Sequence, residues 1–233
     1  NPGGEDPSAP SGFLLQEGLD TLKPNELGKI PIIMYHVIGE SEGEWERTRD
    51  NFRGDLQRFY DLGYSLIPLI DYLTGDISAP AGRAPLVLTF DDATSGQFSM
   101  IESNGEWIPD PNSAVGMMLE FSESHPQFGH AATFFIDFPV PFGDPDRVEE
   151  NLTFLVEHGM EIGSSASEDL VTREVGSLAN KVREICGYET LSFALPYGGY
   201  PNDKAGLASG EWEGHEYTNL GVLLVGAEPA PSP

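Results

Sequence analysis

The stretch Leu86-Val87-Leu88-Thr89-Phe90-Asp91-Asp92 decides the fold, because an apolar run ends there in two adjacent carboxylates. Such a run is typical of a buried β-strand. Two neighbouring carboxylates repel each other unless a cation, a shared proton or water offsets the repulsion, so the pair predicts a metal ligand beside a general base. The alternative at this point is a solvated turn, since aspartate is common in turns.

Similar apolar runs recur along the chain. They cover residues 30–34, 65–67, 86–90, 131–136, 161–163, 191–195 and 222–225. Runs that are apolar at nearly every position indicate parallel strands covered on both faces. Between them, amphipathic patterns predict helices over residues 50–62, 113–124, 146–158 and 168–185. This alternation favours an α/β fold, either a βα barrel or an open parallel sheet, with a long polar loop over residues 198–214.

The chain is expected to form one folded domain. With 233 residues, of which 39% are hydrophobic, it can bury a single sizeable core. Residues 30–233 are predicted to be this domain, and residues 1–29 to be an N-terminal linker and extension, because residues 1–10 are dominated by Pro, Gly and polar side chains. A linker of this kind is typical of what remains after an export signal or anchor is removed, which favours a secreted or cell-surface protein.

The charge of the chain limits its partners. Twelve basic residues against 38 acidic ones give a formal net charge of -26. The resulting field repels nucleic acid, anionic lipid and polyanionic glycans, so a neutral or cationic partner is expected. No apolar run is long enough for a membrane-spanning segment, and the single cysteine, Cys186, excludes an internal disulfide.

Three predicted strands end in chemically useful side chains. Met34-Tyr35-His36 closes the first, Asp91-Asp92 closes the third, and the strand over residues 191–195 continues into Pro196-Tyr197. In parallel α/β barrels the functional groups lie at the C-terminal ends of the strands. We therefore expect the histidine, both aspartates and the tyrosine-bearing loop to face one cleft.

Taken in order, these segments resemble the polysaccharide deacetylases of carbohydrate esterase family 4, the NodB-homology fold, in a branch with an N-terminal Met-Tyr-His segment. The resemblance spans roughly residues 30–225 and depends on the order and spacing of short motifs. These motifs are Pro31-Ile32-Ile33-Met34-Tyr35-His36, Leu88-Thr89-Phe90-Asp91-Asp92-Ala93, Ala132-Thr133-Phe134-Phe135-Ile136, Gly159-Met160-Glu161-Ile162-Gly163 and Leu195-Pro196-Tyr197-Gly198.

The resemblance implies a distorted (β/α)7 barrel that removes acetyl groups from N- or O-acetylated carbohydrate with a divalent metal, Zn²⁺ or else Co²⁺ or Ni²⁺. By position, Asp91 is then the base that activates water, and Asp92 is a metal ligand. His36 matches the acid that protonates the leaving amine, while Pro196 and Tyr197 line the sugar cleft. In this chemistry the metal polarises the acetyl carbonyl and an unligated carboxylate accepts the proton.

The sequence departs from the family pattern after Gly163. Two histidines that complete the metal site in the family align with Ser165 and Asp169, and the arginine before the Pro-Tyr loop is replaced by Ala194. Asp92 with Asp169 as a second ligand would bind metal weakly, because a catalytic zinc site uses three protein ligands. Two explanations are open. Either the protein has lost the metal and much of its activity, or the sequence omits a disordered stretch after Gly163 that carries the histidines. The alternative to an enzyme is an inactive deacetylase fold that binds carbohydrate without cleaving it.

Two further features bear on function. A glycosidase that works with two carboxylates is a more remote hypothesis, for which Glu161 is the nearest second acid.

Tryptophans also occur in predicted loops, where they serve either as sugar-stacking platforms or in ordinary packing. They are Trp45, Trp107 and Trp212.

Overall fold

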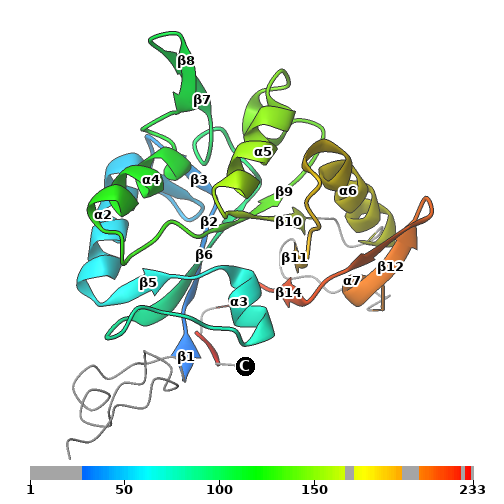
Figure 1. The fold of residues 1–233 in the computed structure, drawn as a ribbon, viewed down its shortest axis with the longest axis horizontal. Helices are drawn as coiled ribbons and strands as arrows, with labels where there is room; N and C mark the ends of the chain where they lie inside the picture. Colours follow the sequence, from blue (N-terminus) through cyan, green and yellow to red (C-terminus); the bar gives the residue numbers. More distant parts are fainter. Residues whose placement is uncertain (1–27, 166–170, 196–204, 227–228, 232–233) are drawn as a thin grey trace, which may run out of the picture.

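The computed structural model describes residues 28–165, 171–195, 205–226 and 229–231, and it is built around one seven-stranded parallel sheet (Figure 1). The strands are β2 (Ile32–Tyr35), β5 (Tyr64–Leu66), β6 (Ala84–Asp91), β9 (Thr133–Ile136), β10 (Glu161–Ser165), β11 (Ser192–Ala194) and β14 (Gly221–Leu223). They run in the order β14-β11-β10-β9-β6-β2, and β5 pairs with the first residues of β6. The sheet is curled, which confirms the predicted α/β fold of the distorted barrel type.

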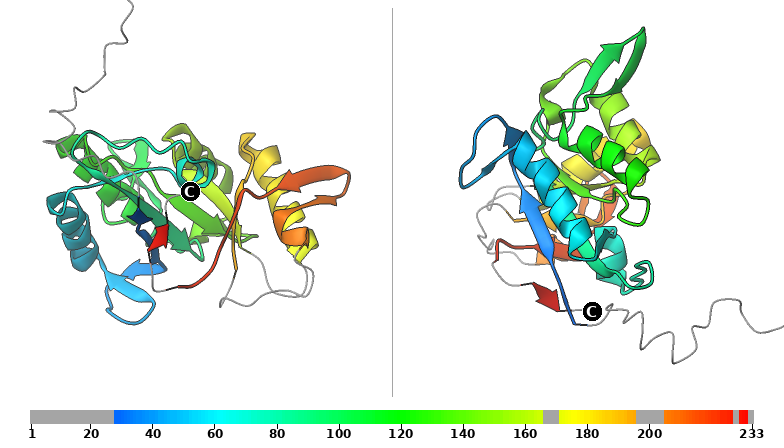
Figure 2. Two further views of the ribbon diagram at one scale, coloured as in Figure 1. Left: turned by 90° about the horizontal axis from the view of Figure 1, so that it is seen from below. Right: turned by 90° about the vertical axis from the view of Figure 1, so that its left-hand side faces the viewer.

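Helices pack around this sheet, with α2 and α6 at opposite ends of it in Figure 2. They are α2 (Arg49–Asp61), α3 (Leu69–Thr74), α4 (Ala114–Ser124), the 3-10 helix η1 (Pro141–Gly143), α5 (Val148–Glu157), α6 (Val171–Cys186) and α7 (Ala205–Ala208). Helix α2 begins where the Thr48 hydroxyl accepts the backbone N–H of Asn51 at 3.2 Å, and it ends before Gly63, which has φ +87°. The four helices predicted from amphipathic patterns are thus confirmed as α2, α4, α5 and α6.

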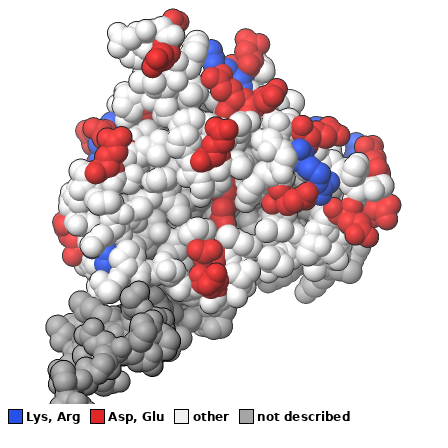
Figure 3. Space-filling model, in the orientation of Figure 1, with Lys and Arg blue, Asp and Glu red and all other residues white. Residues whose placement is uncertain are grey.

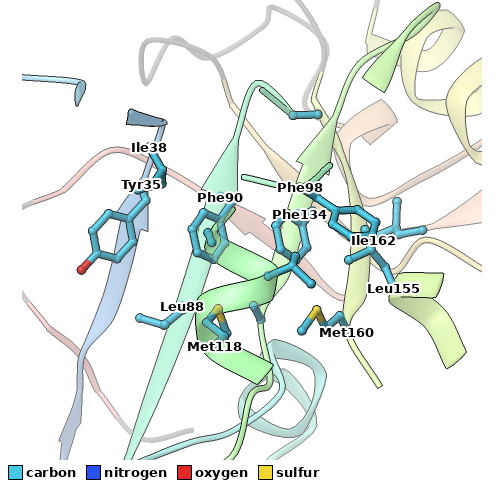
Figure 4. Close-up of a cluster of buried hydrophobic side chains, with 14 of the residues drawn as sticks. Tyr35, Ile38, Leu88, Phe90, Phe98, Met118, Phe134, Leu155, Met160 and Ile162 are labelled. Atoms are coloured by element: carbon cyan, nitrogen blue, oxygen red, sulfur yellow. The ribbon is translucent and has the colours of Figure 1, made fainter. Parts of the chain in front are cut away.

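Strand β6 lies at the centre of the hydrophobic core (Figure 4). Leu88 and Phe90 are fully buried, and the Phe90 ring stacks on Phe134 of β9 at a centroid distance of 4.9 Å. Met118 of α4 and Leu155 of α5 pack into the same cluster. Each such side chain stabilises the fold by about 2 kcal/mol through burial. This packing holds β6 and β9 side by side and therefore fixes the position of whatever follows each strand.

Within the described residues, four pairs of short strands lie outside the main sheet. They are β1 (Lys29–Ile30) with β15 (Ala230–Pro231), β3 (Val37–Gly39) with β4 (Glu46–Thr48), β7 (Met100–Ser103) with β8 (Glu106–Pro109), and β12 (Ser209–Trp212) with β13 (His215–Thr218). The prediction of a polar loop over residues 198–214 is wrong for its described part, which forms α7 and β12. The reason is packing on α6: a Cβ on Gly176 would lie 2.4 Å from the Cβ of Trp212, so glycine lets the hairpin approach closely.

Candidate active site

The C-terminal ends of neighbouring strands open into one cleft. Strand β2 leads to His36, β6 ends at Asp91 and is followed by Asp92, and β9 is followed by Asp137. These four side chains line a cleft of about 1190 Å³, together with residues of α6 and the connection between β3 and β4. The structure therefore brings the three described residues of the predicted site, His36, Asp91 and Asp92, to the same place, at the end of the sheet where barrel enzymes hold their functional groups.

Asp91 is the most unusual carboxylate of the cleft. Its side chain is only 19% exposed, and its Oδ1 atom is buried with no hydrogen-bond partner among the described residues. Burial, and after it the charge of Asp92, raises the pKa of Asp91 to about 7. A carboxyl group with a pKa near neutrality can both accept and return a proton in a reaction. A buried polar atom without a partner is costly to the fold, and such atoms are expected where function requires them.

The backbone after β6 turns sharply to place these aspartates. Asp92 has φ +72° and Ala93 has φ +43°, both in the left-handed region that non-glycine residues rarely occupy. The side-chain amide of Gln97 donates to the backbone carbonyls of Asp91 and His36, and the Phe142 N–H donates to the Ala93 carbonyl at 2.6 Å. Surrounding structure thus holds a strained turn in place, as is common at functional sites.

His36 faces Asp91 across the cleft. Its Nε2 atom lies 4.0 Å from Oδ2 of Asp91, and its ring lies 4.8 Å from the ring of Trp45. Burial lowers the pKa of His36, while the charge of Asp92 opposes this shift. The imidazole is therefore mainly neutral at pH 7, and Asp92 is the group that favours its protonated form.

Asp137 is a cleft residue that the sequence analysis missed. It follows Ile136, the last residue of β9, just as Asp92 follows the end of β6. Burial raises the pKa of Asp137, and the charges of Asp92 and Glu174 raise it further. The signal that could have found it is its place directly after an apolar run, because neighbouring parallel strands bring such residues to one edge.

Four other residues were proposed for a site from the sequence, and one of them lies within the described residues. Asp169, Pro196 and Tyr197 lie outside the described residues. Glu161 is described, but it lies at the start of β10, at the opposite end of the sheet from Asp91. There its carboxylate accepts hydrogen bonds from the backbone N–H groups of Leu69 and Ile70, at 2.9 Å and 3.0 Å, and from the Thr133 hydroxyl at 2.6 Å. It is therefore not the second acid of a glycosidase pair.

The described residues can be tested as ligands for the metal that the resemblance implies. Across the described ranges, no group of three or more His, Cys, Asp or Glu side chains is arranged to hold an ion. Ser165, which aligns with one of the two ligating histidines of the family, lines the cleft with a hydroxyl group. A catalytic zinc site uses three protein ligands. The described donors therefore do not form such a site by themselves.

The curled parallel sheet is that of the polysaccharide deacetylase fold, because solved structures of polysaccharide deacetylases superpose on this chain. No family model matches the sequence, and no curated protein matches it. The likeness to these structures is therefore one of fold.

Three solved structures illustrate this likeness. A deacetylase from Streptococcus pyogenes in complex with acetate superposes with a TM-score of 0.54 and 20% identity, over 75% of this chain and 76% of the other. A polysaccharide deacetylase from Bacillus cereus gives 0.53 and 18%, over 75% and 52%. IcaB from Ammonifex degensii gives 0.52 and 16%, over 75% and 77%. This chain spans about half the length of the Bacillus cereus protein and 54% of a similar Bacillus anthracis protein.

Proposed function

We propose that this chain is a hydrolase that removes acetyl groups from N- or O-acetylated carbohydrate. The observation that carries the proposal is the pair of Asp91, with a pKa raised to about 7, and His36, 4.0 Å away, at the C-terminal end of the sheet. The fold supports it, since solved structures with the same architecture are polysaccharide deacetylases, one of them in complex with acetate.

In the proposed reaction, Asp91 is the base and His36 the acid. The carboxylate of Asp91 takes a proton from a water molecule, whose oxygen bonds to the carbonyl carbon of the acetyl group. The proton that Asp91 takes passes to the neutral imidazole of His36, whose Nε2 lies 4.0 Å from Oδ2 of Asp91. His36 gives this proton to the amine nitrogen of the sugar when the C–N bond breaks, and acetic acid leaves with the water oxygen. Asp92 supports the second step because its negative charge favours protonated His36. For an O-acetyl group, the same proton goes to the sugar oxygen.

The test is acetate release from N-acetylated chito-oligosaccharides. The purified protein is incubated with the oligosaccharide, with and without added Zn²⁺ or Co²⁺, and products are followed by mass spectrometry. We expect loss of acetyl groups by the native protein, and a loss of rate on the order of 10³-fold or more in Asp91→Asn, which corresponds to about 4 kcal/mol. Absence of acetate release from N- and O-acetylated substrates under all these conditions would refute the hydrolase.

Dependence on a divalent metal is part of this proposal. Asp92 and Asp169 are the proposed ligands, and Zn²⁺, Co²⁺ or Ni²⁺ is the proposed ion, which would polarise the acetyl carbonyl when bound. The measurement is the metal content of the protein by mass spectrometry, before and after a chelator, paired with acetate release. Activity that survives complete chelation would contradict the metal dependence without contradicting the hydrolase.

The second candidate is a deacetylase fold that binds carbohydrate without cleaving it. The observation that favours it is Ser165 in the cleft, where the family resemblance leads to a metal-ligating histidine. Binding of an acetylated oligosaccharide without any acetate release would decide for this candidate.

Secretion or display at the cell surface fits either candidate, because extracellular glycans are the proposed ligand class. Among the described residues, no helix is both long enough and apolar enough to cross a membrane.

A further inference from the structure

The three tryptophans of this chain lie in three different environments. Trp212 packs on α6 at Gly176, and Trp107 lies in the β7–β8 hairpin with the guanidinium of Arg147 over its ring, 3.1 Å from the centroid. Trp45 alone among them lines the cleft, within the residues that the structure describes. It remains 48% exposed, so much of its indole surface is open to a ligand.

The segment that carries Trp45 is held firmly in place. Its backbone carbonyl accepts the N–H of Val37 at 3.0 Å, which joins it to strand β3. Two residues further on, Arg47 binds both carboxylate oxygens of Asp55 in helix α2, at 2.8 Å and 2.6 Å, and it also pairs with Glu42. A bidentate pair of this kind gives geometric specificity as well as energy. Trp45 is therefore a pre-positioned aromatic side chain, and one side of it rests against His36.

We propose that Trp45 is a sugar-stacking platform that holds a sugar ring beside His36 in the cleft. The C–H face of a sugar ring packs on an indole, which offers a large rigid apolar surface at a small cost in side-chain entropy. Because its ring centroid lies 4.8 Å from that of His36, a sugar stacked on Trp45 lies directly beside the proposed acid. The inference rests on the proposed function only in that the ligand is a carbohydrate.

The charge of the cleft selects among such sugars. Its described lining carries the carboxylates of Glu44, Asp91, Asp92, Asp137 and Glu174, and the cations of Arg173 and Lys181. The whole chain is acidic as well, and Figure 3 shows acidic groups scattered over one face with few basic ones. A cationic ring also gains from an indole face. The platform should therefore prefer an amino sugar with a free amine over a neutral N-acetylated ring, and should reject an acidic sugar.

The experiment is an isothermal titration of the full chain, read as the heat of binding and not as turnover. The probes are chitosan tetramer, N-acetylated chitotetraose and an oligogalacturonide of similar length. We expect affinity to fall in that order. In Trp45→Ala the affinity for chitosan tetramer should fall about tenfold, the effect of removing one aromatic contact. Trp107→Phe is the matched control and should bind as the native chain does.

Two results would overturn the inference. One is native affinity in Trp45→Ala with an unchanged circular dichroism spectrum; the other is equal affinity for the cationic and the acidic tetramer. Trp45→Phe guards against a folding artefact, because it keeps an aromatic face and should recover part of the lost affinity. The titration is independent of acetate release. Binding through Trp45 without hydrolysis would support this inference while refuting the hydrolase, and hydrolysis with no role for Trp45 would do the reverse.

Discussion

Asp91 and Glu161 are both carboxylates in the same sheet, yet they differ in their position along the strand, their hydrogen bonds and their charged neighbours. Glu161, at the start of β10, is 9% exposed and accepts three hydrogen bonds from Leu69, Ile70 and Thr133. Asp91, at the end of β6, has a buried oxygen without a described partner and the charge of Asp92 beside it. Burial raises the pKa of both groups, but only in Glu161 do hydrogen bonds oppose the shift.

The difference shows how one chemical group serves structure at one end of a sheet and chemistry at the other. Three donors fix the Glu161 carboxylate, so it ties α3 to β9 and β10 and has no free capacity to react. Asp91 faces an open cleft with a proton affinity suited to neutral pH, and the fold tolerates the cost. Burial and a raised pKa therefore do not by themselves identify a catalytic carboxylate. What distinguishes Asp91 from Glu161 is that one of its buried oxygens has no hydrogen-bond donor among the described residues.

The largest expected effect is a loss of stability when Glu161 is replaced. Glu161→Ala leaves two backbone N–H groups and the Thr133 hydroxyl without their acceptor, which should lower the free energy of unfolding by about 3 kcal/mol. Urea denaturation followed by circular dichroism measures it. Glu161→Gln retains one acceptor oxygen and should lose about half as much. A loss below about 0.5 kcal/mol in Glu161→Ala would break the comparison, because surface changes have effects of that size.

Replacement of Asp91 is expected to raise the free energy of unfolding instead. Its pKa is raised from 3.8 to about 7 in the folded protein, so between these pH values the unfolded state binds fewer protons than the folded state. The free energy of unfolding therefore falls as pH rises through this window. Asp91→Asn removes the penalty, and above pH 7 the variant should be more stable than the native chain by on the order of 2 kcal/mol. At pH 4 the two should be equal.

The measurement for Asp91→Asn is a series of urea denaturations from pH 4 to pH 8 in the presence of a chelator, because a bound cation would itself stabilise the ionised carboxylate. A difference between variant and native chain that does not change with pH would show that Asp91 titrates normally.

The effect expected at His36 is on the reaction rather than on the fold. His36→Gln should lower kcat for acetate release by about 10²-fold, the range for loss of a general acid. Its free energy of unfolding should change by less than about 0.5 kcal/mol. Rate and stability are measured on the same preparation. A change in KM with kcat preserved would assign His36 to binding and leave the proposed acid unidentified.

The smallest effect is expected from Asp55, which holds the segment of Trp45 in place through Arg47. Asp55→Asn weakens the bidentate pair with Arg47 and the hydrogen bond from the Tyr35 hydroxyl, at 2.9 Å, without touching the cleft. We expect a loss of affinity for chitosan tetramer of a few fold, on the order of 0.5–1 kcal/mol. The same isothermal titration measures it, and in a Trp45→Ala background the same change should have no further effect.

Much of the fold could be predicted because the strands are apolar at almost every position, a pattern that only a doubly covered parallel sheet explains. The rule that functional groups follow strand ends placed His36 and Asp91 correctly in one cleft. The same rule could have found Asp137 after β9, which was overlooked. The predicted strand over residues 161–163 already placed Glu161 at a strand start, where the same rule argues against a catalytic role. Only the structure shows that α3 and Thr133 supply the donors that fix its carboxylate.

The hairpin of β12 and β13 was also missed, because its residues are polar and its support comes from α6, distant in the sequence. The order of the strands in the sheet could not be predicted from the sequence either, because it too depends on contacts between distant segments. That β2 and β5 share β6 depends on contacts between segments with no common local pattern.

Acetate release by Asp91→Asn and Glu161→Gln, measured side by side on folded protein at pH 8, tests the central claim most directly. The account predicts that Asp91→Asn is inactive yet at least as stable as the native chain, whereas Glu161→Gln keeps its activity and is less stable. A fully active Asp91→Asn, or an inactive Glu161→Gln that is folded, would contradict it.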